Sequence, residues 1–142
     1  MVNKITIAVI APLIVGGLIY ILFRPETLIM FDWFEKAGLL QFIQDLRTSF
    51  KGKLILPQWI IYNLPDALWI LSFTNLMLLI WQLKLTKDSI FWILLAPTIG
   101  VFSELGQATG ILAGTFDLND LYFILAASIT PFIYPKLKTK YS

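Results

Sequence analysis

The residues best suited to chemistry in this chain are Glu104 and Gln107, which lie within the stretch 90–113, where Glu104 is the only charged residue. That stretch is long enough to cross a bilayer. A carboxylate inside lipid costs a few kcal/mol at least, so it is retained where it faces protein or water and has a partner. Asp117 and Asp120 follow in the next polar segment. Such oxygens could act as acids and bases, or could hold Mg²⁺ or Ca²⁺.

The residue types that the chain lacks narrow this chemistry. It contains no histidine and no cysteine. The usual zinc ligands, the commonest general base and the Ser-His-Asp arrangement are therefore excluded, as are disulfides and thiolate chemistry. Any catalysis would depend on carboxylates, amides, hydroxyls and lysines.

Composition indicates an integral membrane protein. Of the 142 residues, 58% are hydrophobic and 14% are charged, against about 45–50% and about 25% in soluble globular domains. We expect an all-α polytopic membrane protein with one domain, residues 1–142. The lipid bilayer is its expected partner, and it could form homo- or hetero-oligomers. The net charge of +2 argues against a nucleic-acid partner.

Four apolar stretches predict four transmembrane helices, at about 5–23, 65–83, 90–110 and 121–134. The first lacks a small-residue cleavage site, so we read it as a retained span and not as a signal peptide. Pro65 suits the first turn of the second span. Pro131 is expected to kink or end the fourth.

The long loop between the first two spans carries an amphipathic pattern. Apolar residues recur every three or four positions between residues 28 and 46, and Gly38 is expected to divide this stretch into two short helices. Such helices can lie in the bilayer interface with their apolar faces in lipid. Packing over the end of the bundle is an equally good reading.

Basic residues set the expected orientation in the cell membrane. The loop between the third and fourth spans has no Lys or Arg, whereas the C-terminal tail carries Lys136, Lys138 and Lys140. The positive-inside rule then favours both termini in the cytoplasm. The basic tail also suits an anionic inner leaflet.

In that topology the acidic residues fall on the outward side. We predict that Asp66, Glu104, Gln107 and Asp117 surround one polar pocket that opens toward the outer leaflet and is roofed by residues 26–50. Gly100 and Ala108 share the Glu104 face of a helix and would leave room beside its carboxylate.

Each of these residues also has a purely structural interpretation. Asp117 could cap the fourth span with Asp120 near the positive end of its dipole, and Asp66 could do the same for the second. Glu104 has no helix to cap. It could instead form an interhelical clamp with a hydroxyl such as that of Thr74 or Ser128.

Three segments together resemble the VanZ-like family of small bacterial membrane proteins: Leu64-Pro65-Asp66, Ser103-Glu104-Leu105-Gly106-Gln107, and Gly114-Thr115-Phe116-Asp117-Leu118-Asn119-Asp120. In that family an E-x-x-Q element precedes a short loop and a D-x-x-D pair that opens the last membrane helix. The resemblance covers about Leu56 to Pro135. It implies a cell-envelope role and a link to antibiotic resistance, since the family is named after a protein associated with low-level resistance to the glycopeptide teicoplanin. Many members carry a histidine that this chain lacks, which puts histidine-dependent chemistry in doubt.

Two classes of function remain. In the first, the protein acts on or binds a lipid-linked or glycopeptide ligand at the outer leaflet, with Glu104, Asp66 and Asp117 as catalytic residues and Gln107 and Asp120 as binding residues. In the second, it is a non-enzymatic membrane module or subunit whose acids are structural. A transporter is disfavoured because four spans contain no internal repeat.

Overall fold

The computed structural model describes the backbone of residues 2–139 and the side chains of residues 7–133. Over this range the chain is all-helical, with seven helices and no strand. The helices are α1 Val2–Phe23, α2 Ile29–Lys36, α3 Leu40–Phe50, α4 Gln58–Tyr62, α5 Leu64–Ile80, α6 Lys87–Ala108 and α7 Leu118–Thr139.

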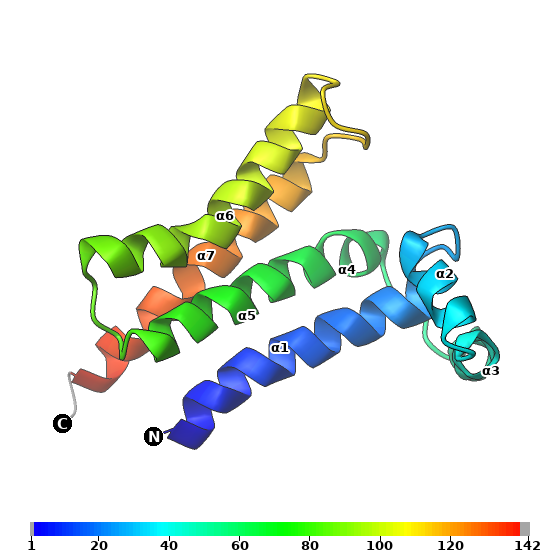
Figure 1. The fold of residues 1–142 in the computed structure, drawn as a ribbon, viewed down its shortest axis with the longest axis horizontal. Helices are drawn as coiled ribbons and strands as arrows, with labels where there is room; N and C mark the ends of the chain where they lie inside the picture. Colours follow the sequence, from blue (N-terminus) through cyan, green and yellow to red (C-terminus); the bar gives the residue numbers. More distant parts are fainter. Residues whose placement is uncertain (1, 140–142) are drawn as a thin grey trace.

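Helix α5 is the centre of the fold. It packs along α1 on one side and against α6 and α7 on the other (Figure 1). A small apolar core joins α5 to α7 and contains Ala67, Ile70, Ile124 and Ala127. Gly100 of α6 faces this core, because a Cβ there would lie 3.0 Å from Ile70 Cδ1 and 3.2 Å from Ile124 Cδ1. The space expected beside Glu104 at Gly100 is therefore filled by apolar side chains.

The four long helices coincide with the four apolar stretches of the sequence. Their ends differ by a few residues, and α6 begins with a capping box in which the Thr86 side chain accepts from the Ser89 N–H. Helix α6 changes direction along its length (Figure 1), which the internal Pro97 explains through its missing N–H. Pro131 was expected to kink or end the last span; it does not end it, since α7 continues to Thr139.

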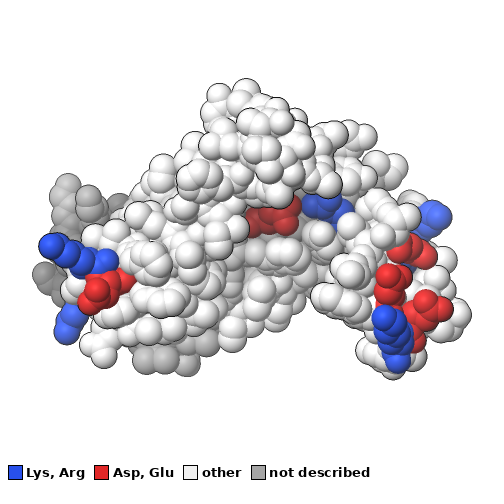
Figure 2. Space-filling model, turned by 45° about the horizontal axis from the view of Figure 1, so that its top comes forward, with Lys and Arg blue, Asp and Glu red and all other residues white. Residues whose placement is uncertain are grey.

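One described helix, α6, is long and apolar enough to cross a membrane by length and composition. Shorter apolar helices cover Ile7–Phe23, Leu64–Ile80 and Leu118–Ile133. Large apolar side chains are exposed along all four, including Ile14, Ile80, Phe102 and Ile129. Charged side chains gather at the two ends of the molecule and in one hollow between them (Figure 2).

The amphipathic stretch forms α2 and α3, and the predicted break at Gly38 is confirmed by its φ of +71°. These helices do not form the expected roof over the acidic residues. Instead α3 packs against α1, where the Arg47 guanidinium donates to the backbone carbonyls of Ile21 and Arg24. Those carbonyls at the C-terminal end of α1 have no partner within the helix, so Arg47 completes this end.

Candidate functional site

The site begins where α1 ends, at Arg24. Its Nη2 donates to the Tyr62 carbonyl at 2.9 Å and lies 3.4 Å from Asp66 Oδ2. The guanidinium is also held between two aromatic rings, 4.8 Å from the centre of Tyr20 and 4.9 Å from that of Tyr62. Arg24 therefore fixes the first turn of α5, which carries Asp66, against the end of α1.

Asn63 joins this corner to α7. It lies between α4 and α5, is only 3% exposed, and its amide nitrogen donates to Asp117 Oδ2 at 3.0 Å and to Asp120 Oδ1 at 2.7 Å. Both hydrogens of one amide thus hold two carboxylates side by side. Stacking of Trp59 on Phe123, with ring centres 5.6 Å apart, reinforces the contact between α4 and α7.

Glu104 approaches from α6 and is 6% exposed. Its Oε2 accepts from the Asp117 backbone N–H at 3.4 Å. Asp120, Asp117 and Asp66 all lie near enough for like-charge repulsion with Glu104. We call the six residues Arg24, Asn63, Asp66, Glu104, Asp117 and Asp120 the acidic cluster.

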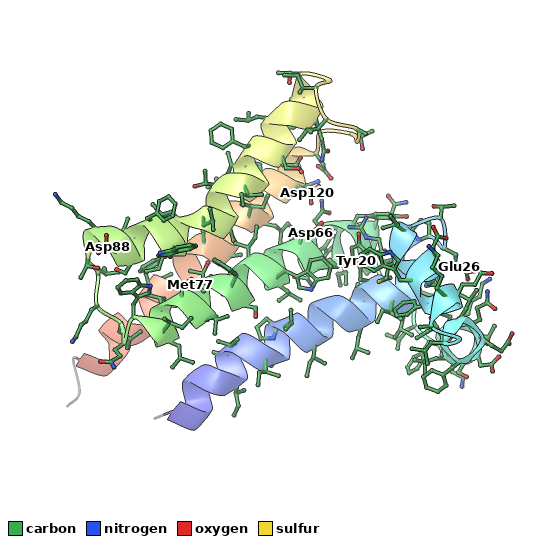
Figure 3. All side chains as sticks on the ribbon, in the orientation of Figure 1. Tyr20, Glu26, Asp66, Met77, Asp88 and Asp120 are labelled. Atoms are coloured by element: carbon green, nitrogen blue, oxygen red, sulfur yellow. The ribbon has the colours of Figure 1, made fainter. Side chains whose placement is uncertain are left out.

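Figure 3 shows Asp66 and Asp120 in the middle of the molecule, and Figure 2 shows acidic atoms beside basic ones in a hollow there, between uncharged walls. Asp66 and Asp120 are neighbours at the junction of α5 and α7 (Figure 3). Four carboxyl groups, one each from α5, α6 and α7 and one from Asp117 just before α7, here meet a single guanidinium and a single side-chain amide. The cluster therefore offers more acceptors and negative charge than its own donors satisfy.

Asp117 has a helix-capping role as well. Its Oδ1 accepts from the Asn119 backbone N–H at 2.9 Å, as an N-cap side chain does at the start of a helix such as α7. The hydrogen bonds from the Asn119 N–H and the Asn63 amide hold the pKa of the Asp117 carboxyl below its usual range. The interpretation of Asp117 as a helix cap is thus confirmed. Its hydrogen bond with Asn63, which follows α4, was not part of that interpretation.

Gln107, the remaining predicted site residue, contacts the loop that follows α6. A Cβ added to Gly114 would lie 2.7 Å from Gln107 Cδ, so the Gln107 side chain packs against that glycine in the loop after α6. Gly114 has a φ of +138°, which favours glycine. Gln107 therefore braces the loop that leads to Asp117.

Metal binding and the hydroxyl clamp both find no support in this geometry. Within residues 2–139, no group of three or more carboxylates is arranged to hold a metal ion. The clamp is wrong, because Ser128 Oγ donates to the Ile124 carbonyl at 2.6 Å and the buried Thr74 Oγ1 has no partner among the described residues. Glu104 is held instead by a backbone N–H.

Sequence reasoning overlooked Arg24 and Asn63, which organise the cluster. Arg24 is separated from Asp66 by 42 positions, and Asn63 from Asp117 by 54. The available signal was the position of each residue: Arg24 directly follows an apolar span, and Asn63 directly precedes Leu64-Pro65-Asp66.

Comparison with family models, with curated proteins and with solved structures gives no match to this chain.

Proposed function

We propose that the chain is a VanZ-like protein of the bacterial cell envelope that crosses the membrane four times through α1, α5, α6 and α7. Its four apolar helices and their exposed apolar side chains support this arrangement, because such a large apolar surface is stable when lipid covers it. The described ends of α1 and α7 lie at the same end of the molecule (Figure 1), which fits an even number of spans with both termini in the cytoplasm.

In this proposal the acidic cluster binds the polar head of a lipid-linked or glycopeptide ligand at the outer leaflet. The observation that carries it is the excess of carboxylates over donors in the hollow, with Glu104 only 6% exposed. Retaining several carboxylates at this position costs free energy unless something compensates them. A ligand head that carries an ammonium or several N–H donors would supply that compensation, so Glu104 and Asp66 are the residues assigned to contact it.

A second candidate is a non-enzymatic module in which the cluster only orders the helices. The cap that Asp117 makes and the bridge that Asn63 makes favour it, since both interactions stabilise the fold by themselves. The two candidates differ in whether function needs the ionised Glu104 carboxylate. Glu104→Gln separates them, because glutamine preserves the shape of the side chain and can still accept the Asp117 N–H.

The test measures binding of teicoplanin, a glycopeptide chosen through the family resemblance, to the protein in lipid nanodiscs. We expect Glu104→Gln to weaken binding by about tenfold or more and to leave the unfolding temperature unchanged. Glu35→Gln, on an exposed position of α2, is the matched control and should bind as the wild type does. Full binding by Glu104→Gln would favour the structural module. Susceptibility of cells that express each variant supplies a second readout.

A further inference from the structure

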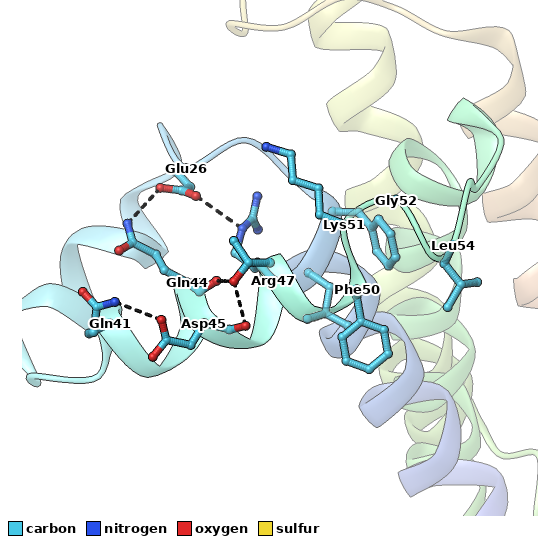
Figure 4. Close-up of a pocket in the computed structure, with 12 residues that line it drawn as sticks. Glu26, Gln41, Gln44, Asp45, Arg47, Phe50, Lys51, Gly52 and Leu54 are labelled. Atoms are coloured by element: carbon cyan, nitrogen blue, oxygen red, sulfur yellow. Dashed lines mark hydrogen bonds and ion pairs between the residues drawn. The ribbon is translucent and has the colours of Figure 1, made fainter.

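A groove of about 540 Å³ lies between the end of α1, one face of α3 and the segment that follows α3 (Figure 4). None of the four carboxyl residues of the acidic cluster lines it. Its apolar part is formed by Leu22, Phe23, Phe50 and Leu54, and its polar part includes side chains of both charges. It is thus a second concave site, with an amphiphilic lining.

The charges in this groove are not equally available. Arg47 already has partners, because it donates to the backbone carbonyls of Ile21 and Arg24 and pairs with Glu26, 3.4 Å from Nε to Oε1. Lys51 has no ion-pair partner among the described residues, and Figure 4 shows its side chain extended at the groove. Asp45 accepts the Gln41 amide on Oδ1 at 3.0 Å, and among residues 7–133 no side chain donates to its Oδ2.

The position of the groove at the end of α1 indicates which part of the membrane surrounds it. It lies where α1 ends, which is the membrane surface if α1 spans the bilayer, and this step rests on the proposed function. Leu54 is 49% exposed and its neighbour Ile55 is 93% exposed. Apolar side chains this exposed beside charged ones are typical of the boundary between headgroups and acyl chains.

We propose that this groove binds a zwitterionic phospholipid with a primary ammonium, of the phosphatidylethanolamine type. The phosphate pairs with Lys51, the ammonium donates to Asp45, and the upper acyl chain packs on Phe23 and Phe50. A free cation and an open carboxylate in one groove match the two opposite charges of such a headgroup. An anionic headgroup without an ammonium would satisfy Lys51 but would face the carboxylates of Asp45 and Glu26.

The experiment is native mass spectrometry of the delipidated protein in detergent, titrated with phosphatidylethanolamine, phosphatidylglycerol or phosphatidylcholine of identical acyl chains. We expect phosphatidylethanolamine to be retained most strongly. Lys51→Gln and Asp45→Asn should each weaken its retention by about two- to fivefold, as expected for partly exposed charge pairs. Lys53→Gln and Asp32→Asn alter exposed charges that do not line the groove, and should have no effect.

Equal retention of the three lipids, a preference for phosphatidylglycerol, or unchanged retention in both Lys51→Gln and Asp45→Asn would overturn this proposal. Extraction of membranes with alkaline carbonate separates it from the proposed function. A chain that resists extraction but shows no lipid preference contradicts the groove assignment alone, whereas a chain released by carbonate contradicts both. The unfolding temperature of each variant is measured beside the wild type, so that loss of fold is recognised as such.

Discussion

At the scale of single residues, one amide joins two carboxyl groups of the acidic cluster. Asn63 is buried and donates to Asp117 and Asp120 at 3.0 and 2.7 Å, so its removal leaves Asp117 with the Asn119 N–H alone and takes this donor from Asp120. We expect Asn63→Ala to lower the free energy of unfolding by about 2 kcal/mol, since hydrogen bonds to charged groups are worth more than neutral ones. Thermal unfolding in nanodiscs measures this. Gln58→Ala removes an exposed amide nearby and should change little; an equal loss in both variants would argue against the bridge.

Asp117 gives a prediction for pH. Its pKa is lowered in the folded state by the Asn119 N–H and the Asn63 amide. A group with a lowered folded pKa contributes stability that is present above its unfolded pKa of about 3.9 and is lost as the pH falls through the folded value. Asp117→Asn keeps an N-cap residue but does not titrate. The stability difference between wild type and Asp117→Asn should therefore shrink as the pH falls from 5 toward 2 (roughly, for such carboxyls). A difference that does not vary with pH would show that ionised Asp117 contributes nothing.

The carboxyl residues of the acidic cluster were predicted from the sequence, whereas their donors Arg24 and Asn63 were not. The spacing of Glu104, Asp117 and Asp120 placed them near one end of two successive helices, and connectivity alone brings those ends together. Arg24 and Asn63 reach the same point through the packing of α1 and α4 on α5, which no local pattern contains. Gln107 was assigned to the same pocket from helical periodicity, which does not contain its contact with Gly114 in the loop after α6.

At the scale of elements, α3 is connected to the acidic cluster through Arg24. Its Arg47 donates to the Arg24 carbonyl at 2.8 Å, and the Arg24 side chain in turn holds Asp66. The amphipathic pattern and the break at Gly38 predicted α2 and α3 correctly. Their position could not be read from the pattern, because an apolar face does not specify which helix it covers. The short helix α4 was not predicted either, since Gln58–Tyr62 is too brief for a periodicity.

Substitution of Arg47 tests which interactions hold α3 to the end of α1. Lysine cannot reproduce a planar group that donates to two carbonyls, pairs with Glu26 and lies 5.1 Å over the Phe31 ring. We expect Arg47→Lys to lower the free energy of unfolding by about 2 kcal/mol. Lys36→Gln, an exposed position at the end of α2, serves as control. Wild-type stability in Arg47→Lys would mean that charge alone, without the two carbonyl bonds, holds α3 to α1.

At the scale of the whole molecule, the proposed topology puts the acidic cluster and the turn between α5 and α6 on opposite sides of the membrane. Four apolar stretches predicted the four long helices, because uninterrupted apolar runs are strong local signals. Residues 82–86 of the turn carry a base, Lys84, and the segment 109–117 carries none. Under the positive-inside rule this asymmetry favours the proposed orientation, with the Lys84 turn in the cytoplasm.

Labelling of single cysteines tests that central claim most directly, because the chain contains no cysteine of its own. Thr115 and Lys84 are both exposed and lie beyond opposite ends of α6. We predict that Thr115→Cys reacts with a membrane-impermeant maleimide in intact cells, and that Lys84→Cys reacts only after the cells are permeabilised. Equal labelling of both positions in intact cells, or labelling of Lys84→Cys with protection of Thr115→Cys, would contradict a membrane-spanning α6 with its acidic end outside.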